Sequence, residues 1–216
     1  MMAENGLYGR ELPIRAHQLL DELGAFARKI SAEGPSTGSL YPTFLLTMAT
    51  PIIIQPYERF FAGKGDQSER IISEFDGYPQ YSGLATALKD LKSRQSLDGT
   101  PMGVVEWKFA FLKASSDYKL ADGINPELQY LLKDPKAIDM AKRKSPKNIL
   151  EHLRHAMAHG TIIYLDADIN PALYGGAEFF LFANARTKGK VDFLLISVSD
   201  FKKFISSWAE WLKEPK

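Results

Sequence analysis

Apolar residues recur every three or four positions along most of the chain up to about residue 160, which predicts amphipathic helices. The clearest run covers residues 11–33 and ends before the helix-breaking pair Gly34-Pro35. A second run, 39–61, is the most apolar, and we expect its internal prolines to kink or split the helix. Its polar end, which includes Glu58, is interpreted as a solvated helix end. The Gly-, Asp- and Ser-rich stretch 63–83 is interpreted as a loop.

Further amphipathic segments are expected at 84–96 and 103–113, with a turn at 98–101 between them. Two short helices follow at 126–133 and 135–144. Aromatic residues within an apolar run are more often core residues than a base-stacking platform. We therefore expect three aromatic side chains of the second amphipathic segment to lie in the core: Trp107, Phe109 and Phe111.

After residue 160 the apolar pattern changes to period two, which is typical of strands with one buried face. The expected strands are 161–165, 178–185 and 191–199. A last helix at 201–213 follows, with Asp200 or Ser199 as its N-cap. The whole pattern predicts an α+β fold that is mostly α, with a helical bundle and a small antiparallel sheet of two or three strands before the C-terminal helix.

Length and composition fit one domain. The chain has 216 residues, of which 45% are apolar and 25% charged, so it can bury a sizeable core, and no linker interrupts it. We expect a single domain, 1–216, with helices over about 10–160, the sheet over about 161–199 and the last helix over about 200–213. The 27 basic and 26 acidic side chains nearly cancel. Near-neutrality argues against a protein that coats nucleic acid by bulk charge, so any RNA contact must be local.

Cysteine is absent, which excludes disulfides and thiolate sites and fits a cytoplasmic protein. The first ten residues hold no apolar signal segment, and the longest apolar run, 44–54, is too short to span a bilayer. We expect a cytoplasmic chain with no membrane span.

Three of the four histidines fall in one stretch, 145–160. Ser145 suits an N-cap, Pro146 suits the first helical position, and Gly160 can end a helix in the left-handed conformation. At about 100° per residue, the two faces of this helix differ. Its apolar face holds Ile149, Leu150, Leu153, Ala156 and Met157. Its polar face holds Glu151, His152, His155 and His159.

Arg154 lies on the flank between these faces, roughly 100° from His155 and about 140° from His159. One copy of the helix therefore does not align the guanidinium with the imidazoles. If the histidine face packs against a second copy about a two-fold axis, two sets of these side chains meet in one cleft. We therefore expect a homodimer with this helix at the interface.

The run Arg154-His155-Ala156-Met157-Ala158-His159-Gly160 resembles the R-x4-H motif of the HEPN superfamily (higher eukaryotes and prokaryotes nucleotide-binding domains). Its apolar flanks also resemble that superfamily, and the order of helices is most similar to the plasmid- and prophage-encoded pEK499 p136 branch. A six-residue motif is short, but its place at the end of a capped helix strengthens it.

The resemblance implies a metal-independent endoribonuclease that leaves 2′,3′-cyclic phosphate and 5′-hydroxyl ends and needs no cofactor. It implies that His159 acts as general base or acid and that Arg154 binds the scissile phosphate. His155 then either orients the two, which we prefer, or acts as the second proton carrier. It also implies a prokaryotic defence or toxin–antitoxin setting, with an antitoxin protein as a partner. A tyrosine found two positions past the motif histidine in some members is Thr161 here, which puts regulation by tyrosine modification in doubt.

A basic cluster precedes the motif and is interpreted equally as an RNA contact or as a solvated face: Lys142, Arg143, Lys144 and Lys147. Three other interpretations of the histidine helix stay open. Glu151, His155 and His159, with His152 beside them, have a spacing that can chelate zinc, although the HExxH pattern is missing. The domain can also be a non-catalytic module that binds RNA or a protein. Finally, the histidines can simply favour the negative end of the helix dipole.

Overall fold

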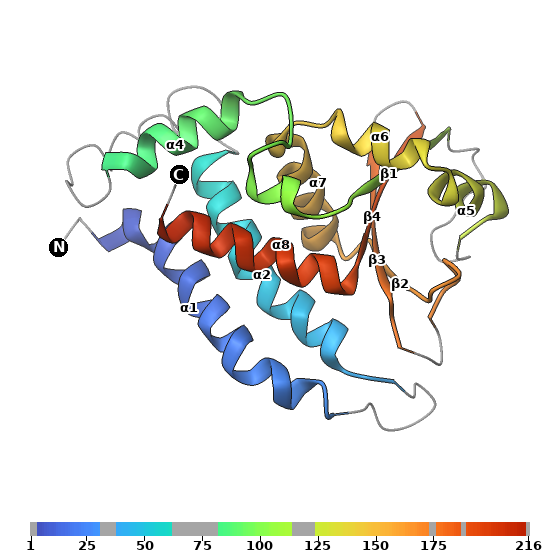
Figure 1. Ribbon diagram of the computed structural model, residues 1–216, viewed down its shortest axis with the longest axis horizontal. Coiled ribbons are helices and arrows are strands. Elements are labelled where there is room, and N and C mark those ends of the chain that lie inside the picture. Colours follow the sequence, from blue (N-terminus) through green and yellow to red (C-terminus); the bar gives the residue numbers. More distant parts are fainter. Residues whose placement is uncertain are drawn as a thin grey trace.

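The computed structural model describes residues 4–30, 38–61, 82–113, 124–172, 176–186 and 189–214. Helices predominate, and together with one antiparallel sheet they confirm the α+β, mostly α fold (Figure 1). The helices are α1 Glu4–Ala27, α2 Tyr41–Phe60, α4 Ser82–Ser93, the 3-10 helix η3 Pro101–Val104, α5 Pro126–Lys133, α6 Lys136–Lys142, α7 Pro146–His159 and α8 Val198–Lys213. The strands are β1 Lys108–Lys113, β2 Ile162–Leu165, β3 Phe179–Arg186 and β4 Lys190–Ser197. The expected loop at 63–83 lies almost entirely outside the described residues.

The sheet has four strands in the order β1-β4-β3-β2, with every neighbouring pair antiparallel. The expectation of two or three strands, all after residue 160, is therefore wrong. The additional strand, β1, comes from the 103–113 segment and pairs with β4 from Lys108↔Leu195 to Lys113↔Lys190. An apolar run as short as this one has no period that separates a strand from a helix, so only its pairing with β4 decides.

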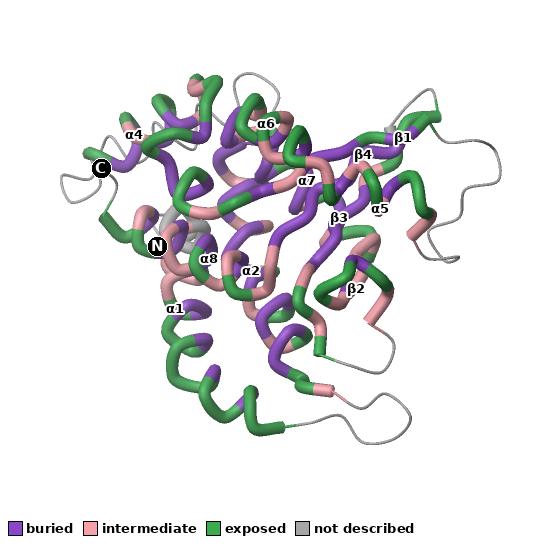
Figure 2. The backbone as a smooth tube through the Cα atoms, turned by 45° about the vertical axis from the view of Figure 1, so that its right-hand side comes forward, coloured by how far each residue is buried: buried purple, intermediate pink, exposed green. Residues whose placement is uncertain are grey.

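Both faces of the sheet are covered. Alternate residues of β3 and β4, such as Phe182 and Leu194, join the main core with α1, α2, α7 and α8. Their neighbours, such as Phe193, face a second core with α5 and the turn around Ile169. Figure 1 shows α5 on the opposite side of the strands from α2, α7 and α8, and Figure 2 shows the buried stretches concentrated where strands and helices meet. Burial on both faces explains why β3 and β4 carry nearly continuous apolar runs.

The prolines of α2 do not split the helix, which was one of the two effects expected from sequence. The helix runs unbroken through Pro51 and Pro56. Proline has no N–H, so Pro56 leaves the carbonyl of Ile52 without its helical donor. The indole Nε1 of Trp208 in α8 donates to that oxygen at 2.9 Å. A buried side chain thus replaces the lost bond and fixes α8 against α2.

Helix α1 buries small or medium apolar residues, including Ala16, Leu20 and Ala27. Three other apolar side chains of the helix, Leu19, Leu23 and Phe26, lie on another face and remain exposed, as does Ile30 just beyond the end of the helix. His17, the one histidine outside the 145–160 stretch, is buried, and its Nε2 lies 3.0 Å from Ser206 Oγ of α8. The single apolar face inferred from sequence is therefore two faces, of which only one joins the core.

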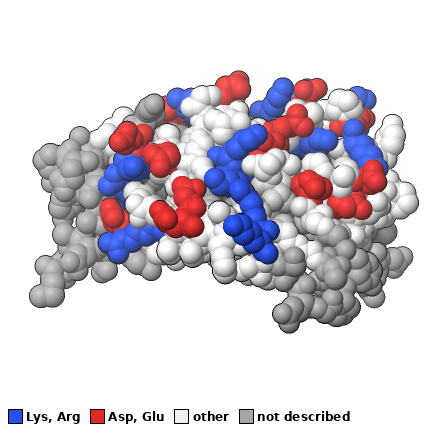
Figure 3. All heavy atoms as spheres, turned by 60° about the horizontal axis from the view of Figure 1, so that its bottom comes forward, with Lys and Arg blue, Asp and Glu red and all other residues white. Residues whose placement is uncertain are grey.

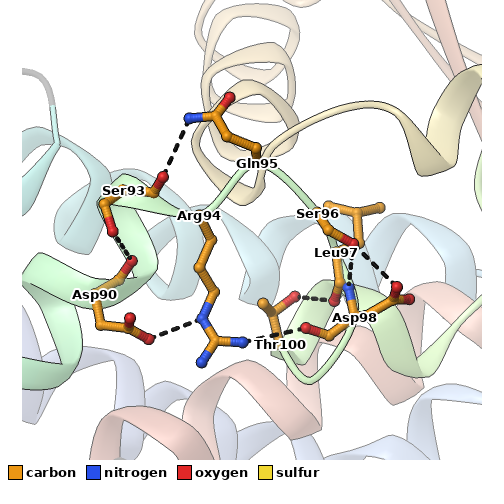
Figure 4. Close-up of polar contacts among 8 residues, drawn as sticks. All are labelled: Asp90, Ser93, Arg94, Gln95, Ser96, Leu97, Asp98 and Thr100. Atoms are coloured by element: carbon orange, nitrogen blue, oxygen red, sulfur yellow. Dashed lines mark hydrogen bonds and ion pairs between the residues drawn. The ribbon is translucent and has the colours of Figure 1, made fainter.

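The expected turn between α4 and η3 is confirmed, and it is held by its own polar groups (Figure 4). Arg94 donates from Nε to Asp90 Oδ2 at 2.8 Å and from Nη1 to the carbonyl of Asp98 at 3.2 Å. Thr100 Oγ1 donates to the carbonyl of Leu97 at 2.6 Å. A Cβ atom at Gly103 would lie 2.2 Å from that same carbonyl oxygen, so this close approach requires glycine.

Two smaller expectations need correction. Trp107 and Phe109 are buried as predicted, but Phe111 is 47% exposed because it lies on the edge strand β1. Helix α8 begins at Val198 rather than at residue 201, and its N-cap is Ser197, whose hydroxyl accepts a hydrogen bond from the backbone N–H of Asp200 at 3.0 Å. Strand β4 ends at this N-cap residue, so α8 begins three residues earlier in the chain than expected.

Charges of both signs share the surface. On the face drawn in Figure 3, Lys and Arg side chains form a band near the middle, with Asp and Glu side chains on both sides of it. This distribution agrees with the small net charge of +1. Within the described ranges, no helix has the length and apolar character needed to cross a membrane.

Candidate functional site

Helix α7 forms as its sequence predicts. Ser145 is the N-cap, and its hydroxyl accepts from the backbone N–H of Asn148 at 3.2 Å. The Asn148 side chain accepts in return from the backbone N–H of Ser145 at 3.4 Å, which completes a capping box. Gly160 ends the helix with φ +67°, the left-handed conformation that favours glycine. The ends of the motif helix are therefore fixed by local sequence.

The polar face of α7 differs from the expected one at His152. This side chain is buried, and its Nε2 lies 2.9 Å from the carbonyl oxygen of Phe182 in β3. Its ring also packs edge-on against Phe109, with 6.4 Å between ring centroids. His152 therefore connects α7 to the sheet and does not belong to an open three-histidine face. The helical wheel missed this because β3 reaches further round α7 than the apolar residues alone indicate.

His155 and His159 remain together at the C-terminal end of α7. They lie one turn apart, both are exposed, and their ring centroids are 4.6 Å apart. Solvent reaches both imidazoles, so either can exchange protons with a bound substrate. The structure therefore brings together two of the three expected catalytic side chains.

Arg154 faces a different neighbour. Its Nε donates to Oε1 of Glu58, near the end of α2, in a close ion pair. The side chain of Arg154 is 32% exposed and that of Glu58 is 40% exposed. From sequence, Glu58 is expected to be a solvated carboxylate at a helix end. The separation of 96 positions along the chain left no local signal that could have identified it.

Tyr57 lies beside this ion pair, buried in α2. Burial raises the pKa of its hydroxyl to about 12, and the nearby negative charge of Glu151 adds to that rise. The positive charge of Arg154 acts in the opposite direction. Tyr57 therefore stays neutral at physiological pH next to a cluster of charges contributed by α2 and α7.

A cavity of about 340 Å³ opens between α7 and the end of β3. It is lined by Asn148, Glu151, His152, His155, Asn184 and Ala185. Asn184 donates from Nδ2 to the backbone carbonyl of His152 at 3.0 Å. Its Oδ1 is buried and has no hydrogen-bond partner in the described part of the chain. The cavity is polar, and among its described lining residues Glu151 contributes a carboxylate.

The basic cluster lies at the other end of α7. Lys142 and Arg143 are exposed at the end of α6, and Lys147 is half-buried in the first turn of α7. Lys144 places its Nζ 3.5 Å from the centroid of the Phe109 ring, so a cation–π contact holds it against the sheet. At about 1.5 Å per residue, Lys147 and His159 are roughly 18 Å apart along the helix axis. An RNA that touches both ends must extend along α7.

The zinc alternative loses one of its donors, because His152 is turned toward Phe182. The described ranges contain no group of three or more His, Cys, Asp or Glu side chains placed to hold a metal ion. The exposed pair His155 and His159 is left without a third donor of this kind.

The sequence was compared with known families, curated proteins and solved structures. The comparison with curated proteins found no match, and neither did the comparison with solved structures. The family model described as HEPN pEK499 p136 matches residues 19–216 and so covers α7 together with the sheet. The resemblance inferred from the R-x4-H run is therefore confirmed, and the chain belongs to the HEPN pEK499 p136 family.

Proposed function

We propose that this protein is a metal-independent endoribonuclease of the HEPN type. In this proposal the ribose 2′-OH attacks the adjacent phosphate, leaving 2′,3′-cyclic phosphate and 5′-hydroxyl ends. His159 moves a proton as general base or acid, Arg154 binds the scissile phosphate, and His155 orients the two. The observation that carries the proposal is the exposed pair His155 and His159 at the end of α7, the helix that also carries Arg154.

The chemistry needs only these residue types. RNA supplies its own nucleophile, so the protein must provide a base for the 2′-OH proton, an acid for the leaving 5′-oxygen and a fixed positive charge for the phosphorane. An imidazole with an ordinary pKa near 6.5 can fill either proton-transfer role at neutral pH. A guanidinium stays charged and can hold two phosphate oxygens at once. In each copy of the chain Arg154 supplies the guanidinium, and His159 supplies an imidazole that can act as base or acid.

A second copy of the chain completes the site in this proposal. Arg154 is engaged with Glu58, on the flank of α7 that faces α2, whereas His155 and His159 face outward. A two-fold axis beside the C-terminal end of α7 would bring the histidines of one copy to the arginine of the other. The homodimer is thus part of the proposed function, and Lys142, Arg143, Lys144 and Lys147 are its proposed RNA contacts. We also propose a cytoplasmic setting in defence or in a toxin–antitoxin pair, with an antitoxin protein as partner.

The test is cleavage of total RNA by the purified protein with EDTA present. We expect cleavage to persist, with cyclic phosphate ends, and Arg154→Ala and His159→Ala each to lower the rate about 10²–10⁴-fold. Arg15→Ala is the matched control, because Arg15 is exposed on α1. This substitution removes one positive charge, as Arg154→Ala does, but at a site away from α7. Cleavage that EDTA abolishes and zinc restores would overturn the proposed mechanism. A protein that binds RNA or a partner protein with no cleavage at all would instead be a non-catalytic HEPN module.

A further inference from the structure

The cavity between α7 and β3 is not used by the chemistry proposed above. We propose that it is a nucleobase subsite that selects guanine in the RNA, with Glu151 reading the base. This inference rests on the proposed function for its biological meaning, but the cavity can be tested by itself.

The charge of the cavity indicates which part of a nucleotide it accepts. Among the described residues that line it there is no Lys or Arg, and the carboxylate of Glu151 carries a full negative charge. A phosphate would be repelled there, because anions need cations or clustered N–H donors. A base is neutral and carries its own donors and acceptors, and protein sites that read single-stranded RNA bind the hydrogen-bonding edges of splayed bases. The cavity volume, about 340 Å³, falls at the small end of the range for ligand pockets.

The carboxylate of Glu151 is available to a ligand. It is exposed, and no described residue forms an ion pair or hydrogen bond with it. An ionised carboxylate offers two acceptor oxygens side by side and no donor. Guanine presents two adjacent N–H donors, N1–H and the N2 amino group, on its Watson–Crick edge. The other three bases present a single donor group on that edge, so guanine fits a carboxylate best.

Asn184 provides an independent observation on the opposite wall. Its Oδ1 is a buried acceptor that lacks a partner within the described ranges, while Nδ2 is held by the His152 carbonyl. An unpaired buried acceptor destabilises a protein, so such atoms are normally satisfied by protein, water or ligand. Because this oxygen is shielded from solvent, a ligand in the cavity reaches it only if the Asn184 amide turns toward the cavity. Glu151 is therefore the acceptor that a bound ligand meets directly.

The position of the cavity connects base selection to the proposed reaction. His155 lines the cavity and also contacts His159, with 4.6 Å between ring centroids. Glu151 precedes His155 by one helical turn, about 6 Å along α7. A guanine bound by Glu151 would therefore hold its own ribose and phosphate beside the two histidines. Cleavage next to guanine is the expected consequence.

The test is titration of the full-length protein with 3′-GMP, 3′-AMP, 3′-CMP and 3′-UMP, followed by calorimetry. We expect 3′-GMP to bind at least about 10-fold more tightly than the other three, and Glu151→Gln to remove most of that preference, since charge-assisted hydrogen bonds are the stronger ones. Asn184→Ala should weaken 3′-GMP binding less. Glu22→Gln, on the exposed surface of α1, is the matched control and should change nothing. Thermal melting of each variant identifies any loss of folding.

Equal affinity for the four nucleotides, or a guanine preference that survives in folded Glu151→Gln, would overturn the subsite. RNA cleavage with no preference for guanine would also overturn the subsite, but it would support the proposal that the protein is a ribonuclease. Tight 3′-GMP binding by a protein that cleaves no RNA would support the subsite and count against the ribonuclease. The two proposals therefore fail separately.

Discussion

The guanidinium of Arg154 in α7 is held through Nε by the carboxylate of Glu58 in α2, so one end of the R-x4-H motif is fixed by a different helix. A guanidinium has five N–H donors, and this contact uses only the Nε donor. Within the described ranges the two terminal nitrogens form no hydrogen bond or ion pair that would keep a phosphate away. Glu58 is therefore a positioning residue in the proposed reaction.

We expect Glu58→Ala to lower kcat for RNA cleavage by about 10-fold, since a misplaced catalytic group loses much of the advantage of orientation. Glu58→Gln keeps an acceptor for Nε and should retain most of kcat. Stability should change little in either variant, because a partly exposed ion pair contributes about 0–1 kcal/mol. Steady-state kinetics and urea unfolding measure the two effects. Faster cleavage by Glu58→Ala would show instead that Glu58 competes with the phosphate for Arg154.

His152→Ala should reduce stability by about 1–3 kcal/mol, because it leaves the carbonyl of Phe182 without its buried partner. The same change at the exposed His155 should alter stability by less than about 0.5 kcal/mol. Urea unfolding monitored by circular dichroism compares the two variants. Equal effects on stability would contradict the assignment of His152 to the core.

We expect the buried hydroxyl of Tyr57 to make the protein less stable at high pH. Its pKa is raised to about 12 in the folded protein by burial and by Glu151, whereas an exposed tyrosine titrates near 10. The contribution of Tyr57 to the free energy of unfolding is fully present below pH 10 and is lost as the pH rises to about 12, because the Tyr57 hydroxyl ionises at a lower pH in the unfolded chain than in the folded protein. Unfolding free energies measured from pH 9 to 12 should fall more steeply for the parent than for Tyr57→Phe. Parallel curves would show that Tyr57 is not the group responsible.

A homodimer is expected, with the C-terminal end of α7 at or beside the interface. Light scattering at micromolar concentration should give twice the chain mass of 24.2 kDa. Mixing inactive Arg154→Ala with inactive His159→Ala should restore part of the cleavage activity if each site takes residues from both copies. A monomer at this concentration would count strongly against a shared site.

Ser197→Ala should destabilise the protein by about 1 kcal/mol, because Ser197 caps α8. Ser199 is the cap suggested by sequence, but it is exposed in the first turn. Its replacement by alanine should cost no more than about 0.5 kcal/mol. Thermal unfolding of both variants decides which serine caps the helix.

Local sequence determined the motif helix and most of the other helices. Ser145, Pro146 and Gly160 define both ends of α7 through interactions within a few residues of each other, so no distant contact is needed. The apolar runs after residue 160 likewise predicted β2, β3 and β4. The expected pattern with one buried face does not hold for β3 and β4, because both faces of these strands are buried. The R-x4-H run, its place in a capped helix, its apolar flanks and the order of helices together indicated the family that the comparison confirms.

Tertiary structure decided what depends on contacts between distant segments. Strand β1 exists through its pairing with β4, and α2 stays continuous at Pro56 because Trp208 supplies the missing donor. His152 was assigned to an open polar face by its place on the helical wheel, yet β3 buries it. Glu58 meets Arg154 only because α2 and α7 pack together. Spacing along one helix fixes which side chains share a face, but the neighbours that cover that face come from elsewhere in the chain.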